Sequence, residues 1–197
     1  QTILNSRQTK YFKSKKIPLI GYSTHRSEEK FCAEIFQNLR KSKNETLILI
    51  PRHVERASLI EKDLMNKNLF VHRHSSDHKI DSKTNVYLVD TYGEAKKFLG
   101  LSKVIFIGGS LVPHGGQNPL DAVRSNAIVI HGPNIGNFKE IYKFLNNEKI
   151  SFKFHSMKQA LNLIKNKNSI NRNTKAKLTK ISSKILAQTK HELLKYV

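Results

Sequence analysis

The sequence predicts an α/β fold in which one parallel β-sheet is covered by helices on both faces. The strand-like segments are continuous apolar runs, such as 46–50 and 104–107, and strands of this kind are buried on both sides. These runs alternate with helical segments along the chain, which is the pattern of βαβ units. A length of 197 residues suits one domain with its own core. We therefore expect a Rossmann-like domain.

Each predicted strand is followed by a segment with helical periodicity or with capping residues. The expected strands cover 17–23, 46–50, 69–73, 85–90, 104–107, 127–130 and 151–154. Helices are expected over 27–39, 54–66, 93–101, 138–145 and 157–164, with another opening at Asn118-Pro119. Ser27 is expected to cap the first helix, with Glu28 and Glu29 in its first turn, where acids favour the helix dipole. Asn137 and Glu140 predict a capping box for the helix over 138–145.

The formal net charge of +20 lies mainly at the two ends of the chain. Residues 1–16 hold five basic residues and no acid, and 151–197 hold eleven basic residues and one acid, which leaves +5 for 17–150. A nucleic-acid-binding domain usually carries its basic residues on the folded face that contacts the nucleic acid, so this distribution argues against that class. Basic flanks around a near-neutral centre suit an anionic membrane surface equally well. A general bias toward lysine and asparagine is the other explanation.

The charge map and the strand pattern together divide the chain into three parts. Residues 1–16 are expected to be a basic interdomain linker or the lead-in to the first strand, 17–168 the Rossmann-like domain, and 169–197 a basic C-terminal helix. That helix could pack on its own domain, on a partner or in a membrane interface. The chain begins at Gln1 rather than at a methionine, so we expect it to be part of a longer protein.

Several classes of protein are excluded by the composition. No apolar run approaches the roughly 20 residues that span a bilayer, and the start shows no secretory signal pattern. The single cysteine, Cys32, excludes an internal disulfide and is expected to be buried as a small apolar residue. His72, His74 and His78 have no cysteine or carboxylate at metal-site spacing, so no metal is expected there.

A glycine-rich loop follows the expected strand 104–107 and ends on Asn118-Pro119, a pair that favours a helix start. Four glycines lie between Gly108 and Gly116. Because glycine has no Cβ, main-chain N–H groups can approach a phosphate closely, and the dipole of the following helix favours negative charge. The loop is therefore either a phosphate-binding element or a plain turn.

Three further loops place polar side chains at the carboxyl ends of strands, where parallel sheets bind their ligands. His25 could contact a substrate or move a proton, or it could simply mark the entry to a helix. Arg52 could form two hydrogen bonds with a phosphate, or it could lie solvated on the surface. Glu94 could accept bonds from the two hydroxyls of a ribose, and Asp121 shares that possibility. The alternatives for these two acids are a place in the first turn of a helix and a capping box.

Taken together, these loops resemble one family, the 3-deoxy-D-manno-octulosonic acid (Kdo) transferases. The resemblance rests on strings in the family's order and spacing: Ser23-Thr24-His25, Pro51-Arg52-His53, Tyr92-Gly93-Glu94, the run from Gly108 to Asp121, and Gly132-Pro133. It covers about residues 17–165 and corresponds to the C-terminal half of the enzyme. The Gly-Gly-Ser-Leu-Val-Pro run, followed by Gly-Gly-Gln-Asn-Pro-Leu, is long and specific.

The resemblance implies a two-domain GT-B glycosyltransferase that moves Kdo from CMP-Kdo to a lipid A precursor at the cytoplasmic face of the bacterial inner membrane. It implies no metal and no cofactor. The expected partners are the donor, the acceptor, the protein's own N-terminal domain and an anionic membrane surface, with no nucleic acid. In this family the C-terminal half binds the nucleotide, and the N-terminal domain supplies the general base that an inverting transfer needs. No catalytic residue is therefore expected in this chain.

Carried over residue by residue, the resemblance implies two groups of binding residues. The expected CMP site consists of Pro51, Arg52, Tyr92, Gly93, Glu94, Asn118, Pro119, Leu120 and Asp121. The expected contacts with the donor phosphate and Kdo are Ser23, His25, Gly109, Ser110, Gly115 and Gly116. Within these groups, Arg52 and the loop 109–118 would bind the phosphate and the donor carboxylate, and Glu94, with Asp121, would bind the ribose.

The chain departs from the family pattern at four places. The family usually has methionine at Tyr92, histidine at Gln117, glutamate at Asp121 and a His-Thr-Phe run at 134–136. The first departure affects packing against cytidine, and the third shortens a carboxylate by one methylene. Two other functions stay open: a different GT-B glycosyltransferase or epimerase that uses UDP-sugars, and a basic nucleic-acid-binding module, whose binding would depend on salt and not on the nucleotide.

Overall fold

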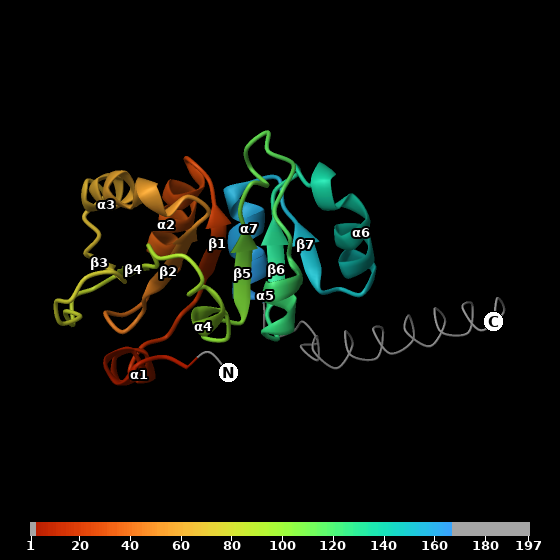
Figure 1. The fold of residues 1–197 in the computed structure, drawn as a ribbon. Coiled ribbons are helices and arrows are strands. Elements are labelled where there is room, and N and C mark those ends of the chain that lie inside the picture. The colour runs from red at the N-terminus through yellow and green to blue at the C-terminus, as the bar shows by residue number, and fades with distance from the viewer. Residues whose placement is uncertain (1–2, 167–197) are drawn as a thin grey trace, which may run out of the picture.

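The fold is one seven-stranded parallel sheet with helices on both faces (Figure 1). The computed structural model describes residues 3–166. The strands lie in the order β3-β4-β2-β1-β5-β6-β7, and every neighbouring pair is parallel. Their bounds are β1 (Ile20–Thr24), β2 (Leu47–Pro51), β3 (Val71–Arg73), β4 (Val86–Leu88), β5 (Val104–Ile107), β6 (Ile128–His131) and β7 (Ser151–Lys153). The predicted fold class is confirmed.

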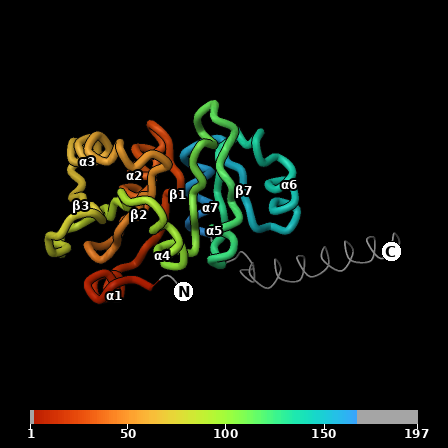
Figure 2. The backbone as a smooth tube through the Cα atoms, in the orientation of Figure 1, coloured from red at the N-terminus to blue at the C-terminus, as the bar shows by residue number. Residues whose placement is uncertain are grey.

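The helices divide between the two faces of the sheet, and Figure 2 traces the backbone through them. One face is covered by α2 (Glu28–Leu39), α3 (Ala57–Met65) and α7 (Met157–Lys165). The other is covered by α1 (Ser6–Lys13), α4 (Lys96–Leu99), α5 (Leu120–Arg124) and α6 (Lys139–Asn147). Two 3-10 turns, η1 (Val54–Arg56) and η2 (Gly136–Phe138), lead into α3 and α6.

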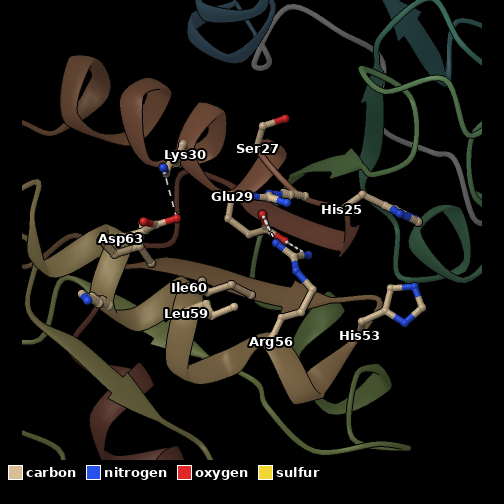
Figure 3. Close-up of a pocket in the computed structure, with 12 residues that line it drawn as sticks. His25, Ser27, Glu29, Lys30, His53, Arg56, Leu59, Ile60 and Asp63 are labelled. Carbon is tan, nitrogen blue, oxygen red and sulfur yellow. Dashed lines mark hydrogen bonds and ion pairs between the residues drawn. The ribbon is translucent and has the colours of Figure 1, made fainter.

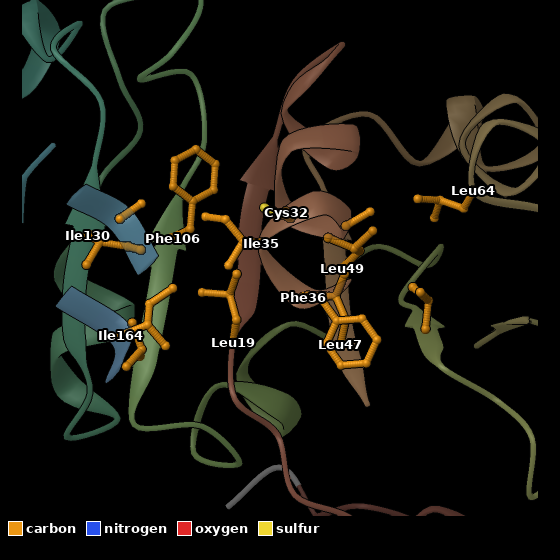
Figure 4. Close-up of a cluster of buried hydrophobic side chains, with 14 of the residues drawn as sticks. Leu19, Cys32, Ile35, Phe36, Leu47, Leu49, Leu64, Phe106, Ile130 and Ile164 are labelled. Carbon is orange, nitrogen blue, oxygen red and sulfur yellow. The ribbon is translucent and has the colours of Figure 1, made fainter. Parts of the chain in front are cut away.

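Each face of the sheet has its own hydrophobic core. Leu47 and Leu49 of β2 pack in the cluster that holds Cys32 of α2, and all three are fully buried (Figure 4). The residues between and after them, Ile48 and Ile50, belong to the cluster on the other face. Because both faces are covered, the strands read as unbroken apolar runs in the sequence. The predicted burial of Cys32 is confirmed.

The N-terminal segment, predicted to be a linker or the lead-in to a strand, instead forms the helix α1. Asn5 and Gln8 form a capping box, in which each side chain accepts the main-chain N–H of the other at 2.9 and 3.0 Å. Tyr11 and Phe12 are buried in the core of the second face, where the ring of Phe12 meets Tyr87 edge to face at 5.0 Å. The helix is therefore an integral part of the domain.

Other elements differ from the prediction mainly in their ends. β5 has the predicted bounds, whereas the helix predicted over 93–101 is reduced to the four residues of α4. Gly93 has a φ of +80°, which no residue within a right-handed helix adopts. The predicted basic helix over 169–197 lies outside the described residues. None of the helices described within 3–166 is long and apolar enough to cross a bilayer.

Candidate functional site

The loops after β1 and β5 meet at the point where the chain changes direction in the sheet. From β1 the chain builds one side of the sheet and then returns to β5 on the other side of β1. Ligands of such sheets bind at this switch point, at the carboxyl ends of the strands. Gly108 allows the two loops to touch, because a Cβ on it would lie 2.1 Å from the carbonyl oxygen of Ser23. The candidate site is therefore built around these two loops.

The glycine-rich loop is held by an acidic side chain from α2. The carboxylate of Glu28, which is 1% exposed, accepts the N–H groups of Gly109 at 2.7 Å, Ser110 at 3.0 Å and Leu111 at 2.9 Å. It also accepts the N–H of His25 at 2.8 Å. One buried carboxylate thus joins the loop after β5 to the loop after β1.

These bonds occupy the main-chain N–H groups of Gly109 and Ser110, whose contact with the donor stays a prediction. Both N–H groups already point at a carboxylate, so a ligand phosphate would meet that carboxylate rather than free donors. Burial raises the pKa of Glu28, and the four N–H donors act in the opposite direction with a smaller combined effect. The cradle of N–H groups exists as predicted, but a side chain of the protein itself occupies it.

Two predicted helix caps are absent, and the glycine-rich loop explains one of them. Ser27 precedes α2 with a φ of +75°, and its side chain makes no capping bond. Asn137 lies in η2, where its side chain donates to the carbonyl of His114 and its N–H donates to the carbonyl of Gly115, both at 2.9 Å. The capping box predicted for Asn137 and Glu140 does not form. Asn137 instead ties the far end of the glycine-rich loop to α6.

Gly115 and Gly116 form the turn that closes the glycine-rich loop. Their φ angles are +91° and +79°, a region that favours glycine. The N–H of Gly116 donates to the carbonyl of Gly109 at 2.8 Å, and a Cβ on Gly115 would lie 2.7 Å from the side chain of Asn137. The turn itself therefore requires both glycines. Their contact with a donor, predicted from the resemblance, stays a prediction.

His25, His114 and Gln117 form a hydrogen-bonded group at the mouth of the switch point. The amide nitrogen of Gln117 lies 3.0 Å from Nε2 of His25 and 2.9 Å from Nε2 of His114. The two rings are 4.2 Å apart, and the ring of His53 is 5.7 Å from that of His25. Burial lowers the pKa of His25 to about 4, and the neighbouring histidines and arginines act in the same direction. His25 is therefore neutral at pH 7 and can accept the amide hydrogen.

Arg52 places a guanidinium group at the same edge of the sheet. It follows the buried Pro51, and its N–H donates to the carbonyl of Thr24 at 2.9 Å, which fixes its backbone beside β1. Its guanidinium is exposed, and no side chain within residues 3–166 pairs with it. The five N–H donors of the guanidinium are thus available to an anion.

The loop after β4 brings Tyr92 and Glu94 to this edge. Tyr92 is 66% exposed, and its hydroxyl donates to Oε2 of Glu55 at 3.0 Å. Oε2 of Glu94 pairs with Lys97 and lies 3.5 Å from Nε2 of His74. Within the described residues, Oε1 of Glu94 has no partner. One oxygen of the carboxylate is therefore free to accept a hydrogen bond from a ligand.

The helix α5 begins close to the predicted position, but one residue later than the predicted cap implies. Pro119, and not Asn118 as predicted, is the N-cap of α5, although Oδ1 of Asn118 accepts the N–H of Leu120 at 3.0 Å. Pro119 is buried directly before the helix. Because α5 has only five residues, its dipole is weaker than that of a longer helix. The helix end therefore adds little to phosphate binding by itself.

Asp121 and Arg52 act in opposite directions on the pKa of one tyrosine, Tyr22 of β1. Oδ1 of Asp121 pairs with Lys96 at 3.6 Å and with Arg124 at 3.4 Å, and its other oxygen has no partner among the described residues. Burial raises the pKa of Tyr22 at the end of β1; the charge of Asp121 raises it further, and Arg52 lowers it.

A cavity of about 690 Å³ lies beside this edge, between α2 and α3 (Figure 3). His25 and His53 stand at one end of it, and Lys30 and Asp63 at the other. Of the residues predicted to bind the donor, only His25 is in its lining. No sequence motif pointed to this cavity.

His72 of β3 and His74, directly after that strand, both contact the ring of Tyr87. Within the described residues, no three His, Cys, Asp or Glu side chains are grouped so that they could hold a metal ion. His74 instead shares a hydrogen bond of 2.9 Å with the hydroxyl of Tyr87, and His72 stacks on the same ring.

Sequence reasoning missed two residues of the site, Glu28 and Gln117. Glu28 was expected only to favour a helix dipole, and Gln117 was noted only as a departure from the family pattern. A usable signal was present for Glu28: a carboxylate directly after the first strand faces the switch point, where a glycine-rich loop presents several N–H groups. For Gln117 the partners, His25 and His114, are brought together only by the fold.

Comparison with known proteins agrees with the resemblance. No family model matches the chain. It is 38% identical over 128 residues to the 3-deoxy-D-manno-octulosonic acid transferase of Haemophilus influenzae, which covers 64% of this chain and 30% of that protein. It is 30% identical over 157 residues to the protein of the same name from Rickettsia bellii, with coverage of 79% and 37%. The chain thus spans about a third of the length of these relatives.

The fold agrees with the same family. The crystal structure of the C-terminal CMP-Kdo binding domain of WaaA from Acinetobacter baumannii superposes with a TM-score of 0.77 and 29% identity. The match covers 91% of this chain and 93% of that domain, so it extends from end to end of a domain rather than over one motif. In sequence and in fold, this chain therefore matches the C-terminal domain of the 3-deoxy-D-manno-octulosonic acid transferase family.

Proposed function

We propose that this chain is the donor-binding domain of a glycosyltransferase that moves Kdo from CMP-Kdo to a lipid A precursor. The observation that carries the proposal is the end-to-end match with a domain described as binding CMP-Kdo. The exposed guanidinium of Arg52 at the carboxyl edge of β2 adds physical support, because a nucleotide sugar brings a negative charge to this edge.

Arg52 is the group best suited to the phosphate of the donor. Two of its N–H groups can bind two phosphate oxygens at once, and no acidic side chain of the described residues competes for them. The N–H groups of Gly109 and Ser110 are taken by Glu28. The side chain of Arg52, rather than the first part of the glycine-rich loop, therefore carries the phosphate in this proposal.

Glu94 and Asp121 are proposed to bind the ribose. Each keeps one carboxylate oxygen without a partner among the described residues, while a lysine holds the other oxygen in place. A carboxylate oxygen accepts well from a sugar hydroxyl, since it is charged and has no donor of its own. Tyr92, exposed beside this loop, is proposed to pack against the cytosine ring.

The rest of the reaction is proposed to lie outside this chain. An inverting transfer needs a base that removes the proton of the acceptor hydroxyl as CMP leaves, and we assign that base to an N-terminal domain. The protein would act at the cytoplasmic face of a bacterial inner membrane, with basic residues against the anionic surface. On this proposal the chain by itself binds CMP and does not transfer Kdo.

Titration calorimetry of the chain with CMP and with UDP tests the proposal. We expect CMP to bind, UDP to bind at least tenfold more weakly, and Arg52→Ala to lower the affinity for CMP at least tenfold. Lys139→Ala, which removes an exposed cation from α6, is the matched control and is expected to bind CMP as the unchanged protein does. Preference for UDP would favour the alternative of a UDP-sugar enzyme, and equal binding by Arg52→Ala would remove the assigned phosphate group.

A further inference from the structure

The cavity between α2 and α3 has properties that the donor site does not explain. It lies on the face of the sheet covered by α2, α3 and α7, whereas Asp121 belongs to α5 on the opposite face. His25 lines the cavity and also contacts Gln117 of the glycine-rich loop. The cavity therefore adjoins the donor site through one shared side chain, without being part of it.

Two ion pairs cross from α2 to the opposite wall of the cavity, one to η1 and one to α3 (Figure 3). Arg56 donates to both oxygens of Glu29 at 3.0 and 3.2 Å, and the side chain of Glu29 is only 4% exposed. Lys30 pairs with Asp63 at 3.1 Å. Each pair joins the two walls, and together they neutralise both acids of the lining.

Positive charge is left over once these pairs are formed. The lining contains four basic and two acidic side chains, and the two acids are those paired with Arg56 and Lys30. Arg26 and Lys62 have no partner among the described residues. Among the described residues, the cavity lining therefore carries two unpaired cations, both exposed, and no unpaired anion.

The same cavity has an apolar wall. Ile60 and Leu64 are buried at its base, and Leu59 stays 67% exposed while it lines the cavity. A single exposed leucine is common on protein surfaces and does not by itself indicate a binding site. Next to two unpaired cations, however, it matches a ligand that joins an anionic group to a less polar body.

We propose that this cavity binds a phosphomonoester group of a second ligand, held by Arg26 and Lys62. On the proposed function, that ligand is the acceptor, whose hydroxyl must come next to the donor sugar at the shared His25. A doubly charged oxyanion is the chemistry that suits this lining, because guanidinium and ammonium groups both pair with phosphate oxygens. The assignment of the ligand as acceptor rests on the proposed function, whereas the oxyanion site rests on the cavity.

Amide NMR spectra of the labelled chain test the proposal, with glucose 6-phosphate, inorganic phosphate and CMP titrated separately at constant ionic strength. We expect glucose 6-phosphate to give saturable shifts at Arg26, Leu59 and Lys62, and CMP to act on Arg52 and Tyr92 instead. Inorganic phosphate should act at the cavity more weakly than the phosphomonoester, because it lacks the body that meets the apolar wall.

The decisive variant is Arg26→Gln with Lys62→Gln, which removes both unpaired cations and leaves both ion pairs intact. The double variant is expected to bind glucose 6-phosphate at the cavity at least tenfold more weakly and to bind CMP as the unchanged protein does. Lys139→Gln with Lys143→Gln removes the same charge from α6 and is expected to change neither. An unchanged melting temperature shows that each variant is folded. This is the expected outcome, because substitutions at exposed positions usually change stability little.

The outcomes separate the two proposals. Shifts at the cavity without any CMP binding would support the oxyanion site and overturn the donor-binding function. Two results would overturn the oxyanion site alone. One is CMP binding without any glucose 6-phosphate shifts at the cavity residues, and the other is cavity shifts that persist in the Arg26 and Lys62 variant. Phosphate shifts spread evenly over all surface lysines would identify an adventitious ion only, and would equally overturn it.

Discussion

The carboxylate of Glu28 accepts the N–H of Gly109 at 2.7 Å, across 81 positions of sequence. This bond and its three neighbours place a negative charge of the protein where the sequence alone predicts a ligand phosphate. The loop after β5 is thus organised from inside the domain. Its shape depends on α2 as much as on its own glycines.

Removal of this carboxylate is expected to destabilise the domain strongly. Glu28→Ala would leave four N–H donors without their acceptor, most of them buried, and should lower the free energy of unfolding by about 4 kcal/mol. Glu28→Gln should cost less, because one amide oxygen can still accept. Urea unfolding measures both, with the exposed Glu140→Ala expected to stay within about 0.5 kcal/mol. A loss below about 1 kcal/mol in Glu28→Ala would contradict the structural role given to this side chain.

The ribose assignment predicts a difference between two nucleotides. Asp121→Asn should lower the affinity for CMP about tenfold, since a hydrogen bond to a charged group contributes about 1.5 kcal/mol. The same change should alter binding of 2′-deoxy-CMP much less, because one of the two hydroxyls is absent. Calorimetry with both ligands gives the comparison, and Lys96→Gln with Arg124→Gln controls for the two ion pairs that the change also removes. Equal losses for both nucleotides would place Asp121 away from that hydroxyl.

The free energy of unfolding is expected to fall as the pH falls, because the imidazole of His131 is buried in its neutral form. Its ring is 2% exposed and donates to the carbonyl of Gly132 at 2.7 Å, and burial lowers its pKa from 6.5 to about 4. The unfolded chain therefore takes up the proton first as the pH falls. The loss of stability begins near pH 6.5, reaches about 3 kcal/mol near pH 4, and is absent above pH 7.

His131→Asn tests this pH dependence, because the asparagine amide can keep the bond to Gly132 without taking up a proton. The variant should lose less stability than the unchanged protein between pH 7 and pH 4.5 in urea unfolding. His25, whose pKa is also lowered to about 4, contributes in the same pH range and leaves part of the slope. The exposed His155→Asn should retain the full slope. If His131→Asn retained it as well, the buried imidazole would not be its source.

The helix α1 is expected to be required for stability. Phe12 is 6% exposed and packs against Tyr87 and Phe98, so Phe12→Ala should lower the free energy of unfolding by about 3 kcal/mol. Lys13→Ala, at the exposed neighbouring position, should change it by less than about 0.5 kcal/mol. Thermal unfolding of both variants decides whether this segment is part of the domain, and an unaffected Phe12→Ala would restore the linker interpretation.

The fold could be predicted because its signal is local. A strand such as β5 is an apolar run between loops, and alternation of such runs with helices defines the class. α1 could not be predicted in the same way, because Tyr11 and Phe12 are adjacent and form no helical period. Their burial depends on Tyr87, which lies far along the sequence.

The candidate site was predictable only in its outline. The loops and their exposed side chains, such as Arg52, follow from the ends of the strands. The binding of the glycine-rich loop by Glu28 could not be predicted from the strand ends, because Glu28 and Gly109 become neighbours only when β1 and β5 pair. Asn137 likewise looks like a helix cap until the loop carrying Gly115 folds against it. A motif in the sequence therefore shows where a loop lies, whereas contacts between distant segments decide which of its groups are available to a ligand.

The bonds from Glu28 also bear on how a ligand would be bound. The segment 109–111 already has its N–H groups satisfied, so it need not become ordered when a nucleotide arrives. Ordering one backbone residue costs about 1–2 kcal/mol, and three residues arranged in advance spare the complex that cost. Discrimination between ligands then falls to side chains rather than to the main chain. Replacing a few surface residues on this rigid edge could therefore change the preferred nucleotide while the fold stays the same.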